Sequence, residues 1–142
     1  MANIIPDSFK SELLKGTHNF ASSGGDSFKL ALYTDISSLS ASTTAFTTTN
    51  EVSTSGTNYT SGGNALTNSG VSVASNTAFI DFADLTFSSV TLSAVGAMIY
   101  NDDNSDKICL ILDVGGTKTA TNGDFIIQFP TADASTAIFR IA

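Results

Sequence analysis

The last third of the chain, residues 81–142, alternates short apolar runs with turn signals. Runs such as DLTF, KICLILDV and AIFRI are separated by clusters of Asp, Asn, Gly and Ser. Short runs rich in β-branched and aromatic residues, bounded by such clusters, are typical of strands joined by tight turns. This pattern predicts a mainly β fold, an antiparallel β-sandwich or barrel, and it constrains the chain more than any other feature.

The individual runs predict where the strands lie. The run 107–114 is almost entirely apolar, which predicts a central strand that is buried on both faces of its sheet. Gly115-Gly116 and Asn122-Gly123 predict turns after it. Further strands are expected at 17–21, 28–34, 78–82, 85–87, 91–100, 125–129 and 137–141.

Residues 6–14 form the best helix candidate. Pro6 fits the first helical turn, where its missing N–H costs nothing. Phe9 and Leu13 are four residues apart and share one face, with Leu14 beside them. Because so short a helix does not persist alone, it must dock on its own domain or on a neighbouring subunit.

The length of 142 residues predicts one domain, with an N-terminal helical segment at 1–16 and an extended polar region at 35–70. The polar region is rich in Ser, Thr, Gly and Asn, which favour loops and short edge strands. It is interpreted either as an excursion over the surface of the domain or as an arm that contacts neighbours in an assembly. The residues expected to contact partners are Phe9, Leu13, Leu14, Phe46 and Tyr59.

The charge balance limits the classes of partner. With 6 basic and 13 acidic residues the net charge is −7, so the chain lacks the basic patch that neutralises nucleic-acid phosphates. No apolar stretch approaches the roughly 20 residues that span a bilayer, and the N-terminus lacks the basic segment of a signal peptide. We therefore expect no nucleic-acid and no membrane partner, and synthesis in the cytoplasm.

The segment DVGGTK, residues 113–118, resembles the phosphate-binding segment of sugar kinases of the hexokinase and actin-like superfamily. Those enzymes carry it near their start and need a much longer chain for a two-lobed cleft. Here it lies near the end of a short chain and leads into Asn122-Gly123, a hairpin signal. We therefore interpret the two glycines as a hairpin turn with positive φ.

Other catalytic or metal-binding patterns are incomplete. His18 is the only histidine and Cys109 the only cysteine, which leaves too few ligands for an ordinary zinc site. The Asx-rich run 101–106 offers oxygen ligands for Ca²⁺, but it lacks the glycine and the glutamate of an EF-hand loop and is interpreted as a turn. We predict a structural histidine, a buried cysteine, no enzymatic activity and no cofactor.

Five segments together cover nearly the whole chain: PDSFKSELLKGTHNF, DSFKLALYTD, TTTNEVSTSGTNYTSGGNAL, DFADLTFSSVTLSAVGAMIYND and GDFIIQFPTADASTAIFRIA. They resemble a family of small virion-associated proteins of tailed bacteriophages. The resemblance implies a structural role in the virion, first as a trimeric head decoration (cement) protein that binds the major capsid protein. A neck, tail or fibre-base component is the alternative, and a receptor or glycan-binding module is a third class.

Overall fold

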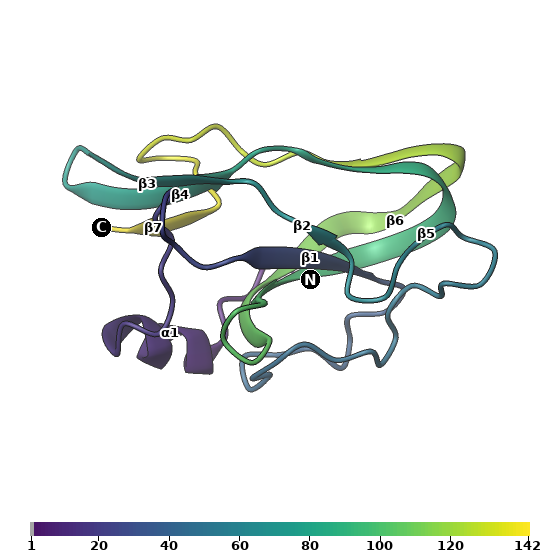
Figure 1. Ribbon diagram of the computed structural model, residues 1–142, viewed down its shortest axis with the longest axis horizontal. Coiled ribbons are helices and arrows are strands. Elements are labelled where there is room, and N and C mark those ends of the chain that lie inside the picture. The colour runs from purple at the N-terminus through teal and green to yellow at the C-terminus, as the bar shows by residue number, and fades with distance from the viewer. Residues whose placement is uncertain (1) are drawn as a thin grey trace.

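The elements, in chain order, are α1 (Asp7–Leu14), β1 (Phe28–Tyr33), β2 (Asn64–Ala65), β3 (Asn68–Ala74), β4 (Thr77–Phe82), β5 (Leu85–Asn101), β6 (Lys107–Ile127) and β7 (Phe139–Ile141). The computed structural model describes residues 2–142 and arranges the strands in two antiparallel sheets (Figure 1). Sheet A has the order β2-β1-β5-β6 and sheet B the order β3-β4-β7. The predicted mainly β fold with a short N-terminal helix is confirmed, as a sandwich-like pair of sheets and not as a closed barrel.

β6 lies at the end of the strand order of sheet A, so the prediction of a central strand at 107–114 is wrong. The prediction that this run is buried on both faces is confirmed, because all residues from Ile108 to Leu112 are buried. Both facts hold because other segments of the chain cover the edge. Ile4 forms an antiparallel bridge with Ile111, and Ala45 forms one with Lys107.

The glycine pair in DVGGTK does not form a hairpin, so that prediction is also wrong. β6 runs on to Ile127 and pairs with β5 on both sides of the pair, at Gly96↔Asp113 and at Ala94↔Lys118. The extra residues on β6 form a bulge, in which Gly115 and Gly116 have φ values of +78° and +96°. The positive φ predicted for the two glycines is confirmed. The chain bends at this bulge but does not reverse direction.

The facing sides of the two sheets enclose an aromatic core. Phe28 of β1 and Phe82 of β4 pack edge to face, with ring centroids 5.8 Å apart. Phe20 precedes β1 and stacks on Phe28 at 4.4 Å. Phe9 of α1 contacts Phe139 of β7 at 5.2 Å, so the helix docks on its own domain and closes the same core.

The opposite face of sheet A carries a second apolar cluster, which the polar region after β1 covers. Ile36 and Leu39 are buried there with Met98 of β5. Phe46 stacks on Tyr100, with ring centroids 4.7 Å apart. The first part of region 35–70 is therefore a covering layer of the domain, and its later part contains β2 and the start of β3.

The chain between α1 and β1 contains no strand, contrary to the expectation at 17–21. Its backbone groups bond to side chains instead of to a neighbouring strand. The N–H of Asn19 donates to the Asp26 carboxylate at 2.9 Å, and the N–H of Ala21 donates to the Asn19 side chain at 3.0 Å. These local bonds replace the ladder that the apolar pattern suggested.

Candidate functional site

His18 is buried between α1 and the start of the β5–β6 turn. Asn101 fixes its tautomer. The Asn101 Oδ1 accepts the N–H of Asp103, so Asn101 Nδ2 is the group that faces the His18 ring. This Nδ2 donates to His18 Nδ1 at 3.0 Å and to Asp26 at 2.8 Å. The proton of the neutral ring therefore lies on Nε2, which donates to Glu12 Oε2 at 2.7 Å. His18 ties the helix to the β-hairpin, as expected for a structural histidine.

Cys109 is buried beside this network and is not a nucleophile. Burial raises the pKa of its thiol well above the ordinary value, and the carboxylates of Glu12 and Asp26 raise it further. Its Sγ lies 3.9 Å from His18 Nδ1, whose lone pair already accepts from Asn101. The thiol therefore stays protonated, and the predicted buried cysteine is confirmed.

The Asx-rich run between β5 and β6 is a turn whose side chains bond within the protein. Asp103 accepts the N–H of Ser27 at 2.6 Å, and Asn104 donates to Asp26 at 3.0 Å. Within residues 2–142, no group of three or more His, Cys, Asp or Glu side chains is placed to hold a metal ion. No helix in the same range has the length and apolar character to cross a membrane.

The five residues expected to contact partners lie in different environments. Phe9 and Tyr59 are 1% and 3% exposed and belong to the core, so they offer no surface to a partner. Leu13 and Phe46 are half-buried against the two apolar clusters. Leu14 is 93% exposed. The structure therefore leaves Leu14 as the fully accessible apolar member of the set and does not bring the five together.

Sheet B presents exposed apolar side chains on the face that it turns toward α1. The register puts these residues in two adjacent rows across the sheet: Val71, Ile80, Phe139 and Val73, Ala78, Ile141. Ile80 and Phe139 are buried in the core, whereas Val71, Val73 and Ile141 are 55%, 73% and 55% exposed. A cavity of about 420 Å³ continues this face toward Leu13 at the end of α1. We call the three exposed side chains and this cavity the sheet B surface.

The sheet B surface is uncharged, although the chain carries a net charge of −7. No Asp, Glu, Lys or Arg occurs in residues 68–80, and none of the described residues that line the cavity is charged. Sequence reasoning missed this surface. The signal was the alternation of Val71 and Val73 with serines, which places both valines on one face of a strand.

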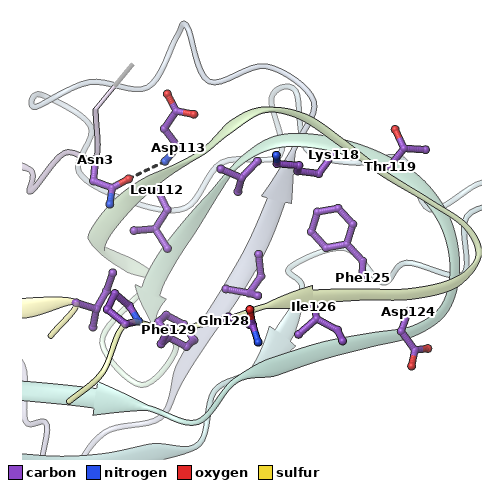
Figure 2. A pocket seen from close by; sticks show the side chains of 14 residues that line it. Asn3, Leu112, Asp113, Lys118, Thr119, Asp124, Phe125, Ile126, Gln128 and Phe129 are labelled. Carbon is purple, nitrogen blue, oxygen red and sulfur yellow. Dashed lines mark hydrogen bonds between the residues drawn. The ribbon is translucent and has the colours of Figure 1, made fainter. Parts of the chain in front are cut away.

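A second cavity, of about 470 Å³, lies along β6, where residues 112–114, 118–119 and 124–127 form its walls (Figure 2). Leu112 and Phe125 supply apolar walls, and Lys118 and Gln128 supply polar groups. Figure 2 shows the Phe125 ring standing in the space between the two arms of β6. An open cavity with an aromatic ring and several hydrogen-bonding groups is suited to a small polar ligand.

Comparisons with known proteins add no relative to this description. A scan against protein-family models matches none, and searches of the curated proteins and of the solved structures find no match.

Proposed function

We propose that this chain is a structural protein of a tailed-phage virion. The role that we propose first is that of a head decoration protein, which binds the major capsid protein as a homo-oligomer and stabilises the shell. The observation that carries this proposal is the sheet B surface, an uncharged apolar area on an acidic domain. Large apolar areas on soluble domains mark sites of interaction with other molecules.

The interior of the chain supports a structural role. Its buried polar groups are used in holding the fold, because every buried side-chain nitrogen and oxygen in residues 2–142 has a hydrogen-bond partner. Catalytic sites commonly keep a polar group poised for substrate in a cleft. Here the ionisable cluster around the buried His18, which also contains Glu12 and Asp26, is bonded internally on all its members.

Capsid binding tests the proposal. Purified chain is added to capsids that lack it, and bound protein is quantified after sedimentation. We expect saturable binding at hundreds of copies per particle, weakened by Ile141→Lys, which places a charge on the sheet B surface. The matched control is Thr86→Lys, because Thr86 is exposed on β5 and lines neither cavity. Absence of binding, or a copy number of a few to a few tens on intact virions, rejects the decoration role; the low copy number favours a neck, tail or fibre-base position.

The β6 cavity favours a second candidate, a receptor or glycan-binding module. Sugars are held by aromatic faces combined with side chains that donate and accept hydrogen bonds, and the cavity offers Phe125, Lys118 and Gln128. A glycan array probed with the labelled chain tests this role. Binding that is lost in Lys118→Ala and Gln128→Ala supports it, and absence of binding to any glycan removes it.

A further inference from the structure

β3 exposes one of its two edges to solvent. It pairs with β4 through a two-residue turn at Ser75 and Asn76, whose φ values of +49° and +62° are those of a type I′ turn. Such a turn is closed by a hydrogen bond between its flanking residues, here Ala74 and Thr77. Because hydrogen-bonding direction alternates along an antiparallel strand, Ala74 and Ser72 bond toward β4. The N–H and C=O groups of Val71 and Val73 then point away from the sheet.

Within residues 2–142, no backbone hydrogen bond reaches this outer edge from another segment. The neighbouring part of β3 is covered, because the Asn68 side chain donates to the carbonyl of Phe20 at 2.9 Å. The cover ends before Val71. Figure 1 shows the β3–β4 hairpin extending past the body of the molecule on the side of α1 and the C-terminus.

From Val71 to the turn, the edge carries none of the usual protection against pairing; the register shift of β3 lies before this part, between Asn68 and Gly70. Natural edge strands are blocked by charged residues, proline or local bulges. Residues 71–80 contain no charge and no proline, and the β3–β4 register is regular from Val71 to the turn. The two residues with outward backbone groups, Val71 and Val73, are also the residues whose apolar side chains are exposed on the inner face of sheet B. Backbone and side chains of the same two residues therefore both lack a partner in the single chain.

A second copy of the chain fits this edge better than an unrelated partner. Antiparallel pairing of a strand with its own copy is self-complementary, since each strand supplies the donors and acceptors that the other needs. Two copies that each carry a charge of −7 repel over most of their surface, and the uncharged hairpin is where this repulsion is smallest. A strongly basic partner would need acidic residues to bind, and the sheet B surface has none.

We propose that two copies of this chain pair through their β3 edges about a two-fold axis, which joins the two B sheets into one continuous sheet. The register follows from the outward groups: Val71 pairs with Val73 of the second copy, and Ser72 lies on the axis. In this register both valines of each copy complete their backbone hydrogen bonds. The apolar faces of the two sheets become continuous across the axis. This two-fold dimer differs from the trimer that the resemblance to phage decoration proteins implies.

Sedimentation equilibrium over a wide concentration range tests the proposal. We expect a monomer–dimer equilibrium for the natural chain, and a monomer at every concentration for Val73→Lys, which places a charge on the edge. Val73 is 73% exposed, so the variant is expected to fold, which circular dichroism verifies. Thr86→Lys, at an exposed residue of β5, is the matched control and should dimerise like the natural chain. A strict monomer, a trimer, or dimerisation unaffected by Val73→Lys overturns the proposal.

A cysteine placed on the predicted axis tests the register separately. Residues directly opposite in a non-hydrogen-bonded pair have Cα atoms about 4.5 Å apart, a distance that a disulfide spans. Ser72→Cys should therefore oxidise to a covalent dimer at least tenfold faster than Ser88→Cys, an exposed control on β5. Cys109 is buried and does not compete. Equal rates for the two variants contradict this pairing.

Discussion

The two sheets of this protein differ in how completely the chain covers them. Sheet A is covered on both faces where β1 and the adjoining parts of β5 and β6 meet, by the aromatic core on one side and by region 35–50 on the other. Its β6 edge is capped by bridges to Ile4 and Ala45. Sheet B has a partly exposed inner face and an open β3 edge. From this difference we infer that sheet A supplies stability within one chain, and we propose that sheet B holds the surface through which the chain meets others.

The largest expected effect comes from opening the second face of sheet A. Leu39→Ala removes a buried side chain of the covering layer and should lower the free energy of unfolding by about 2–5 kcal/mol. Urea denaturation followed by circular dichroism measures it. Ser38→Ala, exposed on the same loop, is the control and should stay within about 0.5 kcal/mol. A small effect of Leu39→Ala would mean that region 35–50 is a loose arm.

A smaller effect is expected where region 51–63 is tied to β1. The Tyr59 hydroxyl accepts the buried N–H of Leu32 at 3.0 Å and donates to Glu51 at 2.8 Å. Tyr59→Phe leaves that N–H without a partner and should destabilise the chain by about 1–3 kcal/mol. Thermal denaturation detects the change. Glu51→Gln keeps an acceptor for Tyr59 and should cost less; an equal or larger loss would show that the charge of Glu51, and not the tyrosine bond, holds the segment.

Substitutions on the exposed side of sheet B should leave the stability of the monomer unchanged and weaken dimerisation. Val71→Thr keeps the shape of the side chain and removes apolar surface that is 55% exposed. The free energy of unfolding at low concentration should change by no more than about 0.5 kcal/mol, while the dimer dissociation constant should rise severalfold. Chemical denaturation and sedimentation measure the two quantities on the same sample. A clear loss of monomer stability would show that Val71 stabilises the single chain, and would contradict the proposed difference between the two sheets.

The smallest effect concerns the loop that leads into β7. The backbone N–H groups of Ser135 and Thr136 donate to Asp133 at 2.6 and 2.7 Å and lower the pKa of its carboxyl below the ordinary 3.8. A depressed carboxyl pKa gives stability that is present above the ordinary value and is lost as the pH falls through the folded pKa. The amide signal of Thr136 should therefore titrate below pH 3.8 by NMR. A midpoint at or above 3.8 would show that the loop bonds do not form.

Sequence patterns predicted the fold where local chemistry decides it. The helix begins after Pro6 and is followed by Gly16 with φ of +72°, and β1 matches its alternating apolar run. The patterns failed where distant segments decide. A glycine pair predicts positive φ, but only pairing with β5 determines whether the chain reverses or bulges.

The candidate site was harder to predict for the same reason. Phe9 was expected to contact a partner from the helix, and Tyr59 from the polar region 35–70. Their partners are Phe139 and Glu51, which only the folded chain brings near. Val71 and Val73 lie in a short, serine-rich strand of low hydrophobicity. Their exposure depends on where the cover by Phe20 and α1 ends, and no local pattern encodes that.

Amide hydrogen exchange, measured residue by residue at low and at high protein concentration, tests the central contrast most directly. The amide of Ile111 donates to Ile4 at 2.9 Å on the covered edge and should be protected at both concentrations. The amides of Val71 and Val73 should exchange rapidly in dilute solution and become protected as concentration rises. Equal exchange of these two amides at both concentrations would contradict the account, because the β3 edge would then not be the place where copies meet.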